Sequence, residues 1–285
     1  MLRSLFSGIS GLRVNQTMLD VTGNNIANAN TIGFKSSSTV FQDTLSQTMA
    51  GATGPNAAAD QGGTNPMQVG LGVQLAATST NFNQGSAQVT GRSTDLMIQG
   101  DGMFVVQKGT ERIYTRAGSF TFDEDGTLVT PTGGQVQGYQ FDGAGNPSPL
   151  GDLVLNPANT VPATPAGVAM TSYSIGGDGK IIGIFDDGVQ RELGQIALAN
   201  FVNPMGLEKV GETSFRETAN SGAVAIGLPG EDGNGTLMGG ALEMSNVDLA
   251  AEFTNLILAQ RGFQASSRVI TTSDSVLEEL VNIKR

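Results

Sequence analysis

Few side chains in this chain of 285 residues could carry out a reaction, because it contains no His and no Cys. That absence excludes a Ser-His-Asp triad, a thiol nucleophile, a disulfide and the usual zinc, iron–sulfur or haem ligands. Catalysis would rest on carboxylates, on lysines, on a carboxylate-held metal or on the phenols of Tyr114, Tyr139 and Tyr173. We therefore expect a protein that is not an enzyme, with no cofactor and no metal site.

Three local patterns imitate functional motifs without completing them. Asp123-x-Asp125-Gly126 resembles the start of a calcium loop, but neither the Gly position nor a distal Glu fits such a loop. Gly100-Asp101-Gly102 begins like a dinucleotide fingerprint and then lacks its third Gly and a following helix. Glu111 and Asp123 could flank the substrate of a carboxylate-using hydrolase, but the sequence does not give their separation. Turns and a strand start account for the first two patterns, and the hydrolase is kept as an alternative of another class.

Charge is unevenly distributed along the chain, whose net charge is −11. Residues 36–244 carry 8 basic and 20 acidic residues, whereas residues 1–35 carry 3 basic and 1 acidic. An acidic middle repels phosphate backbones and anionic lipids, so we expect neither a nucleic-acid nor a membrane partner. The nearly neutral ends are the regions where contact with like molecules would cost least.

Apolar residues recur with alternating steps of three and four near both ends, which is the spacing of a coiled-coil seam. The first stripe comprises Leu5, Ile9, Leu12, Leu19 and Ile26, and the second comprises Leu249, Phe253, Leu256, Phe263, Ile270, Leu277 and Val281. Asn246 and Asp248 are suited to cap the start of the second helix. The sequence thus predicts a helical domain made of residues 1–30 and 245–285, with the two helices as antiparallel partners.

Two arrangements of these helices fit the periodicity. They could close a bundle against the rest of one monomer, or form a stalk that buries its remaining apolar surface only against neighbouring copies. Leu256 with Ile257, and Leu277 with Leu280, make the second stripe wider than a two-stranded pair needs. This width favours the stalk, with the chain itself as partner and these stripe residues as the subunit interface.

Short apolar runs separated by Gly, Asn and Asp fill the middle of the chain. Asp123–Gly126, Gly176–Gly179 and Asp186–Gly188 are typical of hairpin turns. We expect a mixed α and β fold, in which the paired terminal coiled-coil helices accompany a mainly antiparallel all-β body. The expected boundaries are a linker at 31–70 and a body at 71–244. Within that body an irregular excursion is expected at about 146–193, including the Pro-rich stretch Asn156–Gly167.

Several motifs resemble those of the axial proteins of the bacterial flagellum, the rod, hook and junction subunits. Residues 19–35, LDVTGNNIANANTIGFK, are similar to that family's signature, and Gly100–Phe104, Tyr114–Phe120 and Ser245–Leu249 are similar to segments of hook and distal-rod proteins. The signature residues in this chain are Asn24, Asn25, Ala27, Asn28, Gly33 and Phe34. The resemblance extends over nearly the whole chain.

The resemblance favours a hook subunit, with distal rod as the near relative. It implies a helical homopolymer whose terminal helices line an inner tube and whose β body faces outward. It also implies a curved universal joint that transmits torque from rod to filament, with the distal rod, hook cap and hook–filament junction proteins as partners. A distal rod would instead be a straight drive shaft. A secreted adhesin or matrix protein remains a further alternative.

The expected location is the hook or basal body, outside the cell. The first residues lack a sustained apolar segment, so we expect no cleavable secretory signal. The resemblance implies export through the flagellar type III apparatus instead.

Overall fold

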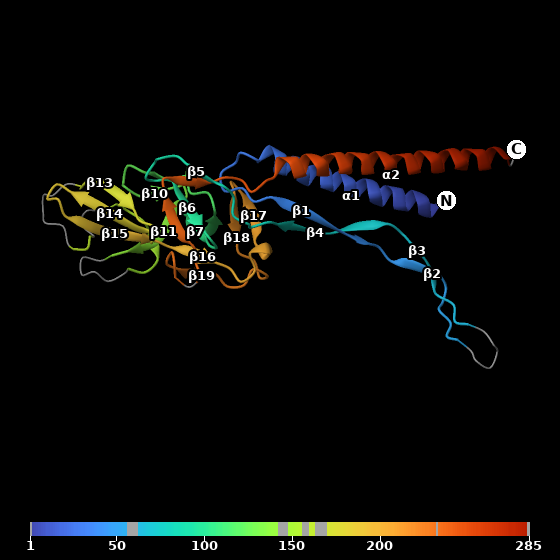
Figure 1. Ribbon diagram of the computed structural model, residues 1–285, viewed down its shortest axis with the longest axis horizontal. Helices are drawn as coiled ribbons and strands as arrows, with labels where there is room; N and C mark the ends of the chain where they lie inside the picture. The colour runs from blue at the N-terminus through green and yellow to red at the C-terminus, as the bar shows by residue number, and fades with distance from the viewer. Residues whose placement is uncertain are drawn as a thin grey trace. The chain divides into compact units, whose positions relative to one another are not determined.

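The computed structural model describes residues 2–55, 62–141, 148–155, 160–162, 170–231 and 233–283. The chain divides into two compact units (Figure 1). The helical unit consists of Met1–Ala27, Ser37–Thr80 and Asp248–Arg285, and the body unit consists of Asn28–Ser36 and Asn81–Val247. Both units are therefore built from segments that are far apart in the sequence.

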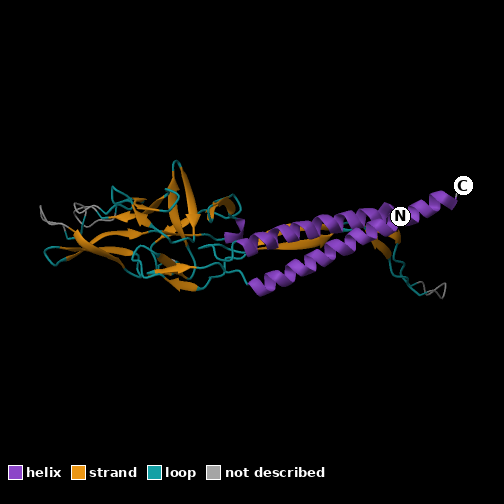
Figure 2. Cartoon of the chain, turned by 90° about the horizontal axis from the view of Figure 1, so that it is seen from above, coloured by secondary structure: helices purple, strands orange, loops and turns teal. Residues whose placement is uncertain are grey.

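Two helices dominate the helical unit, α1 (Leu2–Ala27) and α2 (Leu249–Ile283). They lie side by side, and Figure 2 shows them along their whole shared length. The Oγ atoms of Ser4 and Ser273 are 3.2 Å apart, and Asn25 Nδ2 donates to Glu252 Oε1 at 3.0 Å. The start of α1 thus faces the far part of α2, which confirms the predicted antiparallel pairing.

The start of α2 is fixed by its capping residue. Asp248 Oδ1 accepts hydrogen bonds from the backbone N–H groups of Ala250, at 2.9 Å, and Ala251, at 3.2 Å. These are two of the donors that a helix start leaves without intrahelical partners, so the predicted cap at Asp248 is confirmed. Asn246 does not cap the helix, because its side chain binds backbone groups of the body unit.

Two β ribbons complete the helical unit. β1 (Ser37–Asp43) pairs antiparallel with β4 (Val73–Thr80), and β2 (Ser46–Ala50) pairs antiparallel with β3 (Met67–Gly70). The structure therefore differs from the expected linker at 31–70 and from a body that starts at 71. Most residues of these strands are exposed, so the apolar/polar alternation that identifies a half-buried strand is missing from their sequences.

The body unit is built of short strands and one 3-10 helix, η1 (Pro204–Gly206). Its strands are β5 (Ala87–Val89), β6 (Leu96–Gln99), β7 (Met103–Lys108), β8 (Glu111–Thr115), β9 (Thr121–Phe122), β10 (Leu128–Val129), β11 (Gln135–Gln140), β12 (Gly151–Asp152), β13 (Met170–Ile175), β14 (Lys180–Phe185), β15 (Gln190–Ile196), β16 (Leu198–Asn200), β17 (Glu208–Gly211), β18 (Ser214–Arg216), β19 (Ala225–Gly227), β20 (Thr236–Gly239) and β21 (Ala241–Glu243).

One large sheet organises these strands, and its main path runs β13-β14-β15-β11-β7-β8-β18-β17 (Figure 1). The pairs β6–β20 and β5–β21 stand outside that sheet. Every strand pairing among the described residues is antiparallel, as predicted. The three expected hairpin turns also lie where strands reverse, between β9 and β10, between β13 and β14, and between β14 and β15.

The core of the body lies on both faces of the central strand β7. Phe104 belongs to a cluster with Phe120 and Ile196, whereas Met103 and Val105 belong to a second cluster with other partners. Successive side chains of a strand point to opposite faces, so β7 is covered on both sides. Phe104 and Phe120 pack edge to face with ring centroids 5.0 Å apart.

The expected irregular excursion at 146–193 is shorter in the structure. Strands β13, β14 and β15 form an antiparallel meander from Met170 to Ile196, with one register shift in each pairing. The last Pro of the expected excursion is Pro165, and the strand-forming residues resume after it. Of the Pro-rich stretch Asn156–Gly167, only residues 160–162 lie among the described residues.

Candidate subunit interface

Small and polar side chains form the contact between the two helices. A Cβ added to Gly11 would lie 2.8 Å from Ser266 Oγ, and one added to Gly262 would lie 2.6 Å from Asn15 Oδ1. Real Cβ atoms do not approach so closely, so these glycines allow the two backbones to come nearer than larger residues would. Ala259 is only 1% exposed. The helices therefore meet along a line of Gly, Ala, Ser and Asn.

One residue of the predicted apolar stripes, Ile270, reaches this line, because its Cγ1 would lie 3.0 Å from a Cβ added to Gly8. On α1 the contact residues Ser4, Gly8 and Gly11 each precede a stripe residue by one position, which is about 100° around a helix. Small residues permit the closer approach, so the larger apolar side chains are turned partly outward. Leu5, Leu12, Leu19, Ile26, Leu256, Ile270 and Leu277 are half-buried, whereas Ile9, Leu249, Phe253, Phe263 and Val281 are exposed.

Large apolar side chains consequently remain accessible along both helices. The exposed ones are Phe6, Ile9, Leu249, Phe253, Ile257, Leu258, Phe263, Val269, Val276, Leu280, Val281 and Ile283. Phe6 is 67% exposed and Ile283 is 80% exposed. Exposed apolar surface on this scale typically marks a site of protein association. The geometry therefore supports an interface role for the helices, although the interface occupied by each stripe residue stays a prediction.

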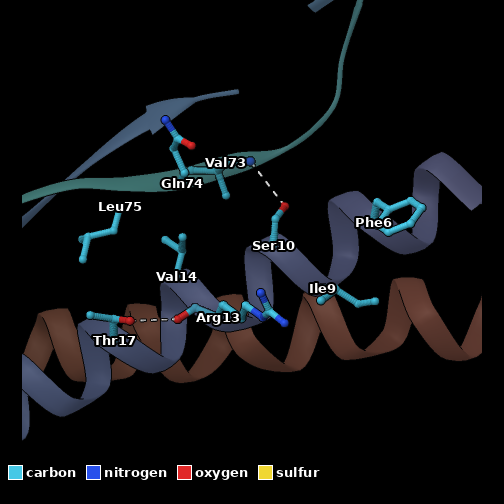
Figure 3. Close-up of a pocket in the computed structure, with 9 residues that line it drawn as sticks. All are labelled: Phe6, Ile9, Ser10, Arg13, Val14, Thr17, Val73, Gln74 and Leu75. Carbon is cyan, nitrogen blue, oxygen red and sulfur yellow. Dashed lines mark hydrogen bonds between the residues drawn. The ribbon is translucent and has the colours of Figure 1, made fainter. Parts of the chain in front are cut away.

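A groove of about 470 Å³ lies between α1 and β4 within the helical unit (Figure 3). Its α1 wall includes Phe6, Ile9 and Arg13, and its β4 wall includes Val73 and Leu75. Ser10 Oγ accepts a hydrogen bond from Val73 N at 3.3 Å, which ties the ribbon to the helix. The groove is mainly apolar, with one cationic side chain on its wall.

The signature residue Asn25 lies near the end of α1, and its side-chain amide links three elements. Its side chain is 1% exposed and forms a two-way bond with Ser37, donating to Ser37 O at 2.8 Å and accepting from Ser37 N at 3.0 Å. The same amide nitrogen reaches Glu252 in the first turns of α2. Only an amide offers both a donor and an acceptor in this geometry, so Asn25 links α1, β1 and α2. Its neighbours Asn24 and Ala27 are exposed.

The remaining signature residues belong to the body unit, where they shape the segment that follows α1. Asn28 Oδ1 accepts a hydrogen bond from Thr31 Oγ1 at 3.0 Å. Gly33 has a φ of +68°, and a Cβ there would lie 2.5 Å from Ala117 N, so only glycine fits. Phe34 stacks beneath the Lys209 ammonium, which lies 5.2 Å from the ring centroid.

A buried carboxylate holds this segment to the body. Glu243 is fully buried; its Oε1 lies 2.5 Å from Lys35 Nζ, and its Oε2 lies 3.4 Å from Arg116 Nη1. Glu243 Oε1 also accepts from Gly85 N at 2.9 Å. Burial lowers the pKa of Lys35 below its ordinary value, and the bond to Glu243 opposes that shift. One carboxylate thus pairs with two buried cations.

Asn246 also joins distant segments of the body, through hydrogen bonds to backbone groups. Its Oδ1 accepts from Ser36 N at 2.8 Å, and its Nδ2 donates to Asn81 O at 2.8 Å and to Asn83 O at 3.0 Å. Neither this link nor the Glu243 network was predicted from the sequence, since both join positions more than 120 residues apart. The only signal was a lone charge, Glu243, between apolar neighbours.

Other kinds of site find little support in the described part of the chain. No group of three or more acidic residues there is arranged to hold a metal ion. Asp123, which suggested a calcium loop, lies in a turn, and its Oδ1 accepts from Glu124 N at 2.7 Å. Neither α1 nor α2 contains a segment that is both long enough and apolar enough to cross a bilayer.

Three family models match successive parts of the chain. Residues 5–35 match the flagella basal body rod protein model, and residues 97–183 match the D1 domain of flagellar hook protein FlgE/F/G. Residues 238–283 match the C-terminal model of the flagellar basal body rod FlgEFG proteins. The first and last matches coincide with the two helices, and the middle match lies in the body.

Similarity to individual proteins extends over the whole chain. The flagellar basal-body rod protein FlgG of Bacillus subtilis is 48% identical over 286 aligned positions, covering 100% of both chains. The corresponding FlgG of Borreliella burgdorferi is 37% identical, again over the full length of both. The flagellar hook protein FlgE of Borreliella burgdorferi is 33% identical over 443 aligned positions, with full coverage of both. The chain therefore belongs to the flagellar FlgE/F/G family of rod and hook proteins, which are structural proteins of the flagellum and not enzymes.

Proposed function

We propose that this chain is the subunit of the distal rod of the flagellar basal body, where it polymerises into a straight, torque-carrying tube. This replaces the hook as the preferred role, because the similarity to rod proteins is both higher and matched in length. Alignment with FlgG of Bacillus subtilis needs 286 positions for the 285 residues of this chain. Alignment with FlgE of Borreliella burgdorferi needs 443 positions, so that hook protein contains long segments that this chain lacks.

Polymerisation is supported by the apolar surface of the helical unit. Leu258 is 60% exposed and Leu280 is 53% exposed, although both lie on a helix that already has a partner. A stable two-helix contact on small residues leaves these side chains available to other copies. Contacts of that kind between different faces repeat without closing, which produces a helical filament.

The partners and location follow from the proposed role. The chain would contact copies of itself and the neighbouring rod and hook proteins, with its helices lining the tube and its body facing outward. It would reach that position through the flagellar type III export apparatus. The flagellar basal body is the resulting site of action.

Electron microscopy of tubes assembled from the purified chain tests the proposal. We expect straight tubes with a central channel, since a drive shaft must not bend. Curved tubes would favour the hook instead, because a universal joint requires curvature. Failure to form any tube at concentrations that assemble a rod protein would count against both roles.

A further inference from the structure

The α2 helix continues beyond the part that α1 covers. Ser4 faces Ser273, so Leu2, the first described residue of α1, lies opposite Ser275 in the same register. Residues 276–283 of α2 therefore extend about two turns, or roughly 12 Å, past that point. We call these residues the overhang. Val276, Leu280, Val281 and Ile283 within it are 40%, 53%, 68% and 80% exposed.

The overhang is amphipathic, with acids at the borders of its apolar face. At 100° per residue, Val276, Leu280 and Ile283 share one stripe, and Val281 widens it. Glu279 lies beside the Ile283 edge of the stripe, and Glu278 lies beside the Val281 edge. Both glutamates are exposed, and no described basic side chain is within ion-pair distance of either.

The groove between α1 and β4 has the complementary features. Phe6, Ile9 and Leu75 give it apolar walls, and its volume of about 470 Å³ lies in the range of pockets, about 300–1,000 Å³, that enclose a drug-sized ligand. Such a volume accommodates several aliphatic side chains. The Arg13 side chain lies on its wall, without a carboxylate within ion-pair distance among the described residues. The groove thus offers apolar depth and one unpaired positive charge.

We propose that the overhang of one copy docks in the α1–β4 groove of a second copy, with Glu278 or Glu279 paired to Arg13. This rests on the proposed polymer and names one of its contacts. The overhang of the same copy cannot fill its own groove. In the observed register Ile9 lies opposite Arg268, and Val281 is thirteen residues, or roughly 20 Å, further along α2.

The contact joins two different surfaces of the helical unit, so each copy offers one overhang and one groove. A contact of this type leaves both ends of any oligomer open to further addition. Docking buries the most exposed apolar side chains of α2 and neutralises Arg13 at the same time. The apolar overhang and the groove, with their opposite charges, therefore complement each other.

Cysteine cross-linking tests the contact cleanly, because the natural chain contains no Cys. Tubes assembled from a chain carrying both Ile9→Cys and Val281→Cys are oxidised and examined by denaturing electrophoresis without reductant. We expect a ladder of disulfide-linked oligomers, which disappears on reduction. Each single substitution should give no oligomer beyond a dimer.

The matched control carries Ile9→Cys with Leu258→Cys. Leu258 is on the same helix and is similarly exposed, at 60% against 68% for Val281, but it lies outside the overhang. We expect no ladder from this pair. Tubes that form normally but give no more cross-linking for the Val281 pair than for the Leu258 pair would overturn the docking contact and leave the rod proposal intact. A natural chain that forms no tubes would instead refute the rod proposal.

Charge reversal provides a second test. Arg13→Glu, and Glu278→Arg combined with Glu279→Arg, should each raise the critical concentration for assembly about two- to five-fold, the size expected of an accessible ion pair. The chain with all three reversals should recover most of the loss. Additive losses in that chain would contradict the proposed ion pairing.

Discussion

The two units differ in how deeply their large apolar side chains are buried. In the body, Leu96, Ile98 and Phe104 are completely buried among other parts of the same unit. In the helical unit, Phe6, Leu258 and Ile283 are between 60% and 80% exposed. The body thus has a closed apolar core of its own, although Val89 and Val202 are exposed on it, whereas the helical unit leaves large apolar side chains exposed along both helices. We infer from this difference that the body contributes most to the stability of the folded chain, and that the helical unit contributes most to its assembly.

The contrast arises from the residues at each contact. Sheet strands such as β7 bury alternate side chains on both faces, which places many apolar residues of the body in its core. The helices instead meet through Gly11, Gly262 and Ala259, which use little apolar surface. Large side chains such as Phe6 and Leu258 therefore stay exposed on the helices.

Deleting Leu2–Ala27 should have the largest effect. It should remove the function of the helical unit and leave the body unchanged. We expect assembly to be abolished, because α2 loses its partner and the groove disappears. The body should keep its native circular dichroism and a cooperative unfolding transition, since none of its segments is removed. Tube formation by this variant would contradict the assignment of assembly to the helices.

Glu243→Gln should produce the largest loss of stability within the body. The substitution leaves Lys35 and Arg116 buried without their carboxylate, and removing one member of a buried ion pair typically costs about 3–5 kcal/mol. Urea denaturation of the body measures the loss.

The control for that variant is Glu212→Gln. Glu212 pairs with Lys108 at 2.7 Å, but both side chains are nearly half exposed. Exposed ion pairs contribute little to stability, so this variant should unfold almost like the natural chain. Equal losses in the two variants would show that the buried network has no special role.

Gly262→Ala and Gly23→Ala compare a glycine at the helix contact with one that faces open space. A Cβ at position 262 meets Asn15, whose Nδ2 is held by a 2.8 Å bond to Gly11 O, so crowding should cost about 1–3 kcal/mol. A Cβ at position 23 meets nothing within 4 Å, so the higher helix propensity of Ala should add up to about 1 kcal/mol. Thermal unfolding, followed by the helical circular dichroism signal, measures both changes in stability. Shifts of the same sign in the two melting temperatures would contradict the close helix contact.

A smaller effect should appear in the body at alkaline pH. Burial raises the pKa of Tyr114 from 10.0 to about 12, and nearby Glu217 adds to the shift. Because the folded state keeps this proton longer, the stability contributed by Tyr114 is complete below pH 10.0 and is lost as pH rises to about 12. Tyr114→Phe should lose less stability over that interval, as measured by urea denaturation at several pH values. An identical pH dependence in both chains would refute the shift.

Local patterns predicted much of the fold. The two helices, the Asp248 cap, the antiparallel body and three hairpin turns follow from signals within a few residues of each element. The β1–β4 ribbon was missed because its strands bury neither face fully. The division into units was also missed, since nothing local shows that Ser37–Thr80 groups with the helices.

The small residues at the contact between the helices were not predicted, and the reason is physical. Heptad reasoning selects the largest apolar residues as the seam, so it selected Leu5 and Phe253. The helices meet on Ser4, Gly8 and Gly11 because small residues allow a closer approach. The Glu243 network shows the same limit, since no local pattern pairs it with Lys35 across 208 positions.

Hydrogen–deuterium exchange on the free and assembled chain tests the central claim most directly. We predict that amides of α1 and α2 gain strong protection when tubes form, because neighbouring copies stabilise them. Amides of the buried strands β7 and β11 should be equally protected in both states. Helices that are already fully protected in the free chain, or a gain confined to the body strands, would contradict the account.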